Sequence, residues 1–131
     1  MALKLVVVTP EKKVVDSEAD EVQMPGVLGY LGILPGHAPL ITELATGILT
    51  YKKGSKEARL ALSAGFAEVA EDTVTVLAEL AEEPGEIDSA AAARERERAE
   101  GELGAATPET LDAIRTRIAL ADARLEVARK G

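Results

Sequence analysis

The chain changes character at Glu82-Glu83-Pro84-Gly85, and this step constrains the fold more than any other feature of the sequence. Before the step, β-branched residues and turn dipeptides interrupt every long window, which disfavours helices. After it, alanine, glutamate and arginine predominate, and these residues have high helix propensity. All three aromatic residues precede the step, and seven of the eight arginines follow it. The sequence therefore predicts one domain over residues 1–84 and another over residues 85–131.

The first part has the pattern of short strands separated by turns. Strands are expected over residues 3–8, 13–17, 19–24, 33–34, 39–44, 47–52, 58–62, 66–70 and 73–77. Pro25-Gly26 and Pro35-Gly36 are expected to end two of them, and Glu71-Asp72 to form a hairpin turn. Many short strands at this spacing predict an antiparallel β-sandwich or a flattened barrel.

The second part has the pattern of two helices. Asp88 is a suitable N-cap for a helix over residues 89–102, and Thr107-Pro108 is a suitable start for a second helix. The second helix carries one apolar seam at steps of three and four: Leu111, Ile114, Ile118, Ala121, Leu125 and Ala128. The first helix offers only alanines and Leu103 for packing. The overall prediction is a mainly β chain with an α appendage, in which an N-terminal sandwich is followed by a C-terminal two-helix hairpin that leans on the sandwich or on another protein.

Composition excludes several classes of function. The chain has no cysteine and one histidine, His37, so cysteine-held metal clusters, disulfides and thiolate catalysis are excluded. A formal charge of −8 and a scarcity of aromatic rings disfavour nucleic-acid binding. No apolar run approaches the roughly 18 residues of a membrane span, and the first residues are too soon interrupted for a secretory signal. We expect a soluble, cytosolic protein with little catalytic equipment, and we interpret His37 as a structural or interface residue.

Three groups of residues could suggest a functional site but fit structural roles better. Four glycines crowd one region, namely Gly26, Gly29, Gly32 and Gly36. Their spacing matches no phosphate-binding loop, and no lysine lies between Lys13 and Lys52, so we interpret them as turn residues. The charged run from Arg94 to Arg98 is typical of a solvated helix face with weak ion pairs, and Glu82-Glu83 is interpreted as a solvated linker.

The stretch Val27-Leu28-Gly29-Tyr30-Leu31 is apolar although the glycines around it predict a loop. Either this loop is tucked under the sandwich, or it is an exposed tip that docks on a partner. The sequence leaves both interpretations open.

One long segment, together with its flanks, resembles a known family. The segment is Gly32-Ile-Leu-Pro-Gly-His-Ala-Pro-Leu-Ile-Thr-Glu-Leu-Ala-Thr-Gly47, and the flanks are Val8-Thr-Pro-Glu11, Ala19-Asp-Glu-Val22, Ser63-Ala-Gly-Phe66 and Val74-Thr-Val-Leu77. Together they resemble the epsilon subunit of bacterial and chloroplast F-type ATP synthases, over the whole chain.

The resemblance implies a ten-stranded sandwich with a helical hairpin, in a non-catalytic rotor subunit. Its sandwich would bind the gamma subunit and the ring of c subunits, here through Val27, Leu28, Gly29, Tyr30, Leu31 and His37. Its hairpin would lie compact or extend along gamma, and the extended form would inhibit ATP hydrolysis. The subunit would be peripheral, without membrane insertion, at the cytoplasmic face of a bacterial plasma membrane or the stromal face of a thylakoid.

Some relatives bind ATP through Ile/Leu-Asp-x-x-Arg-Ala at the start of the first helix. Here the run begins with Ile87 and Asp88, but Ala91 takes the arginine position. A phosphate loses a charged donor there, so we expect no nucleotide cofactor.

In the extended form, the resemblance implies that Arg115, Arg117 and Arg124 meet acidic segments of the catalytic beta subunits, beside alpha. The alternative is that these arginines pair with Asp112, Asp122 and Glu126 on their own helix. A different class of function is an enzyme or a small-ligand-binding sandwich with a helical lid. Such a protein would need a nucleophile–base pair, a metal cluster or a cofactor loop, and none is evident in the sequence.

Overall fold

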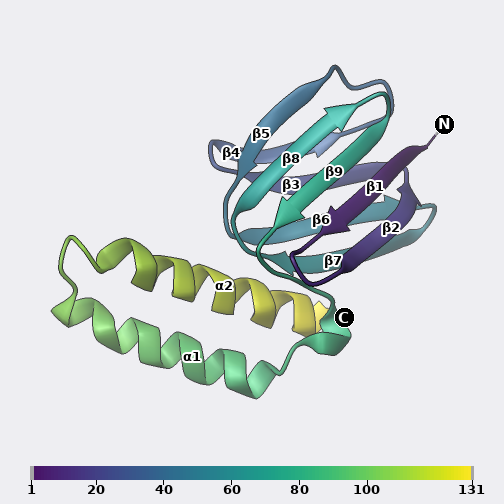
Figure 1. Ribbon diagram of the computed structural model, residues 1–131. Coiled ribbons are helices and arrows are strands. Elements are labelled where there is room, and N and C mark those ends of the chain that lie inside the picture. The colour runs from purple at the N-terminus through teal and green to yellow at the C-terminus, as the bar shows by residue number, and fades with distance from the viewer. Residues whose placement is uncertain (1, 131) are drawn as a thin grey trace.

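Ten strands form a barrel-like sandwich in the computed structural model, which describes residues 2–130 (Figure 1). The strands are β1 (Leu3–Val8), β2 (Lys13–Ala19), β3 (Glu21–Gly26), β4 (Gly29–Ile33), β5 (Leu40–Leu44), β6 (Gly47–Lys53), β7 (Lys56–Leu62), β8 (Gly65–Ala70), β9 (Thr73–Ala78) and β10 (Ala81–Glu82). They follow the order β10-β7-β6-β3-β5-β8-β9-β1-β2, and β4 pairs with β3. The mainly β architecture predicted from the sequence is confirmed.

The pairing is antiparallel except between β1 and β9, which run parallel. These two strands are far apart in the sequence, so no hairpin connection forces them to be antiparallel. The main core lies between the strands and consists of alternate, fully buried side chains such as Leu5, Val22 and Leu49. The buried residues of this core all lie between Leu3 and Ala81.

The region around Pro25 differs from the sequence prediction. Pro25-Gly26 does not stop the strand at Met24: both residues belong to β3, which ends at Gly26, and the Pro25 carbonyl accepts a hydrogen bond from the Ala45 amide at 2.8 Å. Residues 27–31 do not form a loop either. Only Val27 and Leu28 form the turn, and the chain re-enters the sheet as β4 at Gly29, whose φ of 132° suits glycine.

Gly65, at the start of β8, is required by a close strand approach rather than by its φ angle. An added Cβ would lie 2.0 Å from the carbonyl oxygen of Leu77 on β9, and backbone cannot yield as a side chain can. Glycine therefore allows β8 and β9 to pair closely at this end of the sandwich.

The second part forms the two expected helices, α1 (Ser89–Glu102) and α2 (Leu111–Lys130), with short 3₁₀ turns at Pro84–Glu86 and Leu103–Ala105. Asp88 caps α1 as expected, because its Oδ1 accepts from the Ala91 amide at 3.0 Å. Helix α2 begins at Leu111 instead of at Pro108. A turn over residues 108–110 precedes it, and the Thr107 amide donates to the Thr110 hydroxyl at 2.9 Å there.

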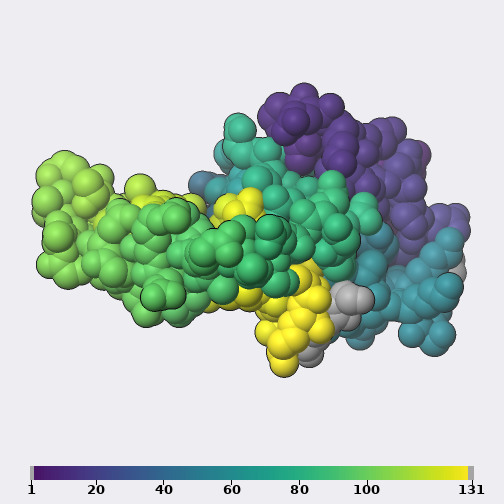
Figure 2. Space-filling view, turned by 90° about the horizontal axis from the view of Figure 1, so that it is seen from below, coloured from purple at the N-terminus to yellow at the C-terminus, as the bar shows by residue number. Residues whose placement is uncertain are grey.

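Helix α2 lies between the sandwich and α1, and the loop that joins the two helices projects away from the sandwich (Figures 1 and 2). Ile114 and Ala121, from the predicted seam, are buried. Ala123 and Val127 are also buried, against Ala61 of β7, and lie on roughly the opposite side of the helix. The prediction of a single seam was therefore incomplete, because α2 has two buried faces.

We predict that residues 1–84 fold without the hairpin, because the buried residues of the main core end at Ala81. Chemical denaturation of this fragment, followed by circular dichroism, should give one cooperative transition. Residues 85–131 alone should be poorly helical, because their buried helix face would lose the sheet. A non-cooperative transition for residues 1–84 would contradict the predicted boundary.

Candidate functional site

The tip of the β3–β4 hairpin is the most exposed apolar segment that the sequence analysis singled out. Val27 is half exposed, and Leu28 is fully exposed. Leu31 packs against the main core, and the Val27 amide donates to the Glu43 carbonyl at 3.1 Å, so both ends of the stretch are held while the Leu28 side chain projects into solvent. The tip is therefore not tucked under the sandwich but exposed, and its docking on a partner stays a prediction.

Tyr30 is 63 % exposed, but its hydroxyl is not free. The Ile48 amide donates a hydrogen bond to the Tyr30 oxygen at 3.2 Å, which ties β4 to the beginning of β6. The ring therefore presents an apolar surface to solvent while its polar end is held.

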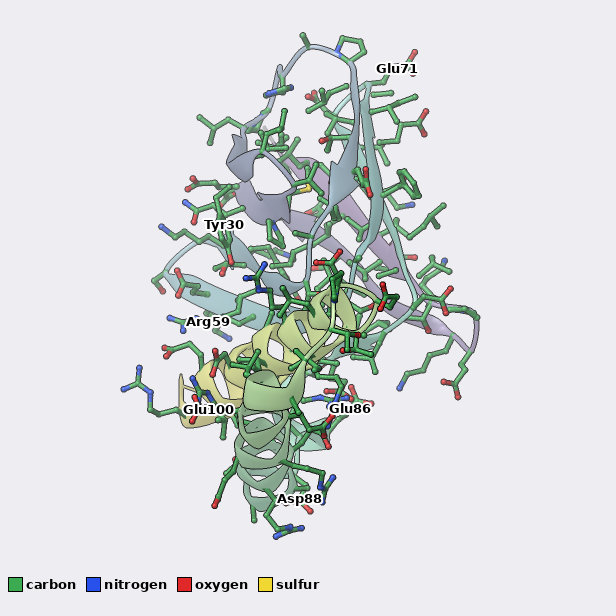
Figure 3. All side chains as sticks on the ribbon, turned by 90° about the vertical axis from the view of Figure 1, so that its left-hand side faces the viewer. Tyr30, Arg59, Glu71, Glu86, Asp88 and Glu100 are labelled. Carbon is green, nitrogen blue, oxygen red and sulfur yellow. The ribbon has the colours of Figure 1, made fainter. Side chains whose placement is uncertain are left out.

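His37 lies apart from this tip, in the loop before β5. The preceding Gly36 donates its amide to the Asp72 carboxylate at 2.7 Å, which fixes the loop beside the turn between β8 and β9. Figure 3 shows that turn, marked by Glu71, at the end of the sandwich away from the helices, whereas Tyr30 lies on the flank. His37 is exposed, and its Nδ1 lies 2.7 Å from the Ala38 carbonyl oxygen. The expected partner-binding residues thus form two separate groups.

A second exposed apolar surface, which sequence reasoning missed, lies on the outer face of β5, β8 and β9. It consists of Ile41, Phe66 and Leu77, all more than half exposed. Phe66 stands opposite both Glu43 and Leu77 in the strand pairing. Period-two alternation along each expected strand would have shown these side chains on the face opposite the core.

A charged cleft of about 570 Å³ lies where the linker meets the two helices. Its lining residues come from β10, the 3₁₀ turn, the two residues that follow this turn, α1 and α2: Glu82, Glu86, Ile87, Asp88, Ala91, Ala92, Arg94, Glu95, Arg98, Arg117, Leu120 and Arg124. Four of these are arginines and four are acids, so the formal charges balance. The cleft contains Ile87, Asp88 and Ala91, the residues of the incomplete nucleotide motif, but Asp88 is engaged as the cap of α1 and Ile87 packs against the Ala61 cluster.

Two arginines of the cleft are held by carboxylates of other elements. Arg124 binds both oxygens of Glu82, with Nε–Oε1 at 2.6 Å and Nη2–Oε2 at 3.0 Å. Arg117 binds Glu95 at 2.7 Å and both oxygens of Glu102 at 2.9 and 3.0 Å. The interpretation of Glu82 as a solvated linker residue is therefore wrong, because Glu82 lies in β10 with its side chain only 22 % exposed.

The alternative interpretation required these arginines to pair with acidic residues of their own helix. Neither Arg117 nor Arg124 does so. Asp122 instead pairs with Arg96 of α1, which joins the two helices, and Glu126 pairs with Arg129 within α2. Arg115 is exposed. In the charged run of α1, Arg98 pairs with Glu95 within the helix, as the sequence predicted.

The ion pairs shift the acidity of their members. The hydrogen bond from Arg117 lowers the pKa of Glu102 below its ordinary value of 4.5, and the bonds that Arg117 donates to Glu102 and Glu95 raise the pKa of Arg117. In the 3₁₀ turn, the Glu83 amide and then Lys12 lower the pKa of Glu86. All these groups are therefore charged near neutral pH.

Within residues 2–130, no group of three or more histidine, aspartate or glutamate side chains is placed to hold a metal ion. Over the same residues, no helix is long and apolar enough to cross a membrane.

Comparison with known proteins gives consistent findings over the whole chain. Residues 2–84 match the model of the family "ATP synthase, Delta/Epsilon chain, beta-sandwich domain". The chain is 54 % identical over 103 residues to the ATP synthase epsilon chain of Koribacter versatilis, covering 79 % of this chain and 72 % of the relative. It is 46 % identical over 130 residues to that of Moorella thermoacetica, covering 97 % and 96 %.

Among solved structures, the fold is similar to a chain of the Euglena gracilis mitochondrial ATP synthase, in the cryo-EM structure of OSCP/F1/c-ring in rotational state 1. The TM-score is 0.83 at 22 % identity, and the match covers 98 % of this chain and 81 % of the other. At this identity the likeness concerns the fold, including the sandwich and the hairpin.

We predict that the Glu102–Arg117 pair stabilises the hairpin only above acidic pH. The folded-state pKa of Glu102 is depressed, so its contribution is present above the unfolded value and is lost as pH falls through the folded value. In urea unfolding followed by helix ellipticity, Glu102→Gln should be less stable than the parent near neutral pH. The two proteins should converge well below the ordinary glutamate pKa of 4.5. An equal difference at both pH values would contradict the assignment.

We also predict that ATP binds weakly or not at all, because Ala91 supplies no donor and three arginines of the cleft, Arg98, Arg117 and Arg124, are already paired. Calorimetric titration should detect no micromolar binding. Ala91→Arg should raise any affinity roughly ten- to a hundredfold, the value of one charge-assisted hydrogen bond. Micromolar binding by the unmodified chain would overturn this prediction.

Proposed function

The chain belongs to the family of ATP synthase epsilon chains, and we propose that it is a non-catalytic rotor subunit of the central stalk, which links the gamma subunit to the c ring and restrains ATP hydrolysis. The observation that carries this proposal is the match to the Moorella thermoacetica epsilon chain along almost the whole of both chains. Both the sandwich and the hairpin are therefore present, and the proposal needs both.

Two separate exposed apolar surfaces support a linking role. The tip of the β3–β4 hairpin, with Val27, Leu28 and Tyr30, is suited to the c ring. Exposed apolar side chains on a short turn can enter a contact without refolding. The outer face with Phe66 and Leu77 is suited to gamma, and the loop that holds His37 lies at the other end of the same two strands, beside their turn. A subunit that joins two partners requires two such surfaces, and here they lie on different strands.

The proposed location follows from the proposed role. The chain would be peripheral to the membrane, on the cytoplasmic face in a bacterium or on the stromal face of the thylakoid in a chloroplast. It would meet the membrane sector only through the c ring.

The proposed regulation uses the hairpin. In the compact arrangement, Arg117 and Arg124 are paired with Glu95, Glu102 and Glu82. When the hairpin extends, Arg124 leaves Glu82 and becomes available to carboxylates of the beta and alpha subunits, for which the bidentate guanidinium geometry is suited. Arg115 is exposed already in the compact form.

The test of this proposal is reconstitution with a catalytic head that lacks its epsilon chain. Addition of the chain should inhibit ATP hydrolysis and should give a complex with gamma that is isolated by gel filtration. If the chain neither binds gamma nor changes hydrolysis, the proposed function is wrong.

We predict that Leu28→Asp weakens assembly with the c ring by at least about tenfold and leaves the free subunit stable. Leu28 is fully exposed, so a charge there costs little in folding but must be desolvated in an apolar contact. Pull-down with the c ring measures the first effect and thermal unfolding the second. Ser55→Asp, at an exposed position in the turn between β6 and β7, is the control. Unchanged assembly of the Leu28 variant would remove the tip from the interface.

We further predict that Arg115, Arg117 and Arg124 contribute to inhibition in the extended form. Replacing all three by alanine should relieve inhibition while assembly through the sandwich persists, because alanine preserves helix propensity. Because two of the three also hold the compact form, Arg115→Ala is the more specific variant. Arg94→Ala, an exposed position on α1, is its control. Equal inhibition by the triple variant and the parent would contradict the prediction.

A further inference from the structure

The apolar contact between the hairpin and the sandwich is small. Ala61 on β7 meets Ala123 and Val127 on α2, with Ile48 and Ile87 at its edge. Alanine and valine side chains fit one another in several registers, so this contact by itself specifies poorly how α2 lies on the sheet.

Two ion pairs flank this contact. On one side, Arg124 binds Glu82 of β10 in bidentate geometry, and the two side chains are only 26 % and 22 % exposed. On the other side, Glu126 lies 3.8 Å from Arg59 of β7, whose side chain is 22 % exposed. At 3.6 residues per turn, positions 124 and 126 lie about 80° to either side of the line through Ala123 and Val127. Figure 3 shows Arg59 beside α2.

The sheet side of this arrangement is fixed by strand register. Glu82 stands opposite Ala61 in the pairing of β10 with β7, so Glu82 and Ala61 face the same way. Arg59 lies two residues before Ala61 on the same strand and faces the same way too. The apolar contact and both sheet charges therefore lie on one rigid surface.

The two ion pairs have their charges in opposite order between helix and sheet. The helix contributes the arginine to one pair and the glutamate to the other. If α2 were turned end for end, Arg124 would approach Arg59 and Glu126 would approach Glu82, which gives repulsion at both flanks. The charges thus select one orientation that the small apolar contact cannot select.

We propose that Glu82–Arg124 and Arg59–Glu126 form a clasp, which holds the hairpin on the sandwich without a bound anion and releases it as one unit. The clasp carboxylates come from the chain itself, so the compact form requires no nucleotide. The pairs that join α1 to α2, namely Arg96–Asp122 and Arg117 with Glu95 and Glu102, involve no residue of the sandwich. Opening the clasp therefore leaves the hairpin intact. Its consequence for hydrolysis rests on the proposed function, whereas the clasp itself is measured on the isolated chain.

The absence of cysteine makes a distance measurement direct. Cysteines introduced at Lys56 and Glu109, both exposed, carry a donor and an acceptor dye for single-molecule energy transfer. Glu82→Gln is compared with Glu79→Gln, which removes the same charge from an exposed position three residues earlier. Glu82→Gln should raise the ratio of open to compact molecules by about tenfold, as expected for a partly buried charged hydrogen bond, and Glu79→Gln should leave it unchanged.

A double-mutant cycle tests the pair itself. Arg124→Gln should open the hairpin about as much as Glu82→Gln, and the double variant should open it little further. Helix ellipticity should remain at the parent value throughout, because the hairpin is released intact. Loss of helix in step with opening, or equal opening by Glu82→Gln and Glu79→Gln, would overturn the proposal.

A salt titration tests the clasp in the parent chain, with the double variant as its comparison. The dye-labelled parent should open as sodium chloride is raised, and the Glu82→Gln, Arg124→Gln double variant should respond less, because its main pair is already absent. A distance in the parent that does not change with salt would also overturn the proposal. These readings need no catalytic head, so a failed clasp is distinguishable from a failed proposed function.

Discussion

The end of strand β7 is buried on both of its faces, and this double burial joins the two parts of the molecule. Leu60 and Leu62 point into the main core, and Ala61 between them is equally buried under α2. An alternating strand normally leaves one face to solvent. Without α2, Ala61 and the partly buried Ile48 of the neighbouring strand β6 would be exposed, which is a modest cost. The sandwich can therefore carry the hairpin without depending on it.

The small size of this apolar contact also explains the role of the charges around α2. A large apolar interface would fix the hairpin permanently, whereas ion pairs with partly exposed members weaken with salt and can exchange partners. Glu82 illustrates the point: it lies on the two-residue edge strand β10, where its backbone pairs with β7 and its carboxylate holds Arg124. One residue thus ends the sheet and begins the contact with the helices.

The sequence was most informative where local chemistry decides the structure. The strand at Leu3–Val8, the Asp88 cap and the Glu71-Asp72 turn follow from side-chain type and short spacing, and the structure contains all three. Features set by distant partners could not be predicted in this way. The parallel pairing of β1 with β9, the second buried face at Ala123 and Val127, and the Glu82–Arg124 pair each join segments far apart in the chain. The exposed surface at Phe66 is intermediate, because strand alternation indicates it but only the register brings Leu77 beside it.

The two exposed apolar surfaces of the sandwich are held in place independently of the two helices. The tip at Leu28 and the outer face at Phe66 belong to β-hairpins whose buried side chains lie in the main core. That core contains no residue of α1 or α2. Release of the hairpin would therefore leave both surfaces in place, since close-packed cores transmit a change only through residues that they share. A subunit built in this way could remain attached to its partners through the sandwich while its helices change position.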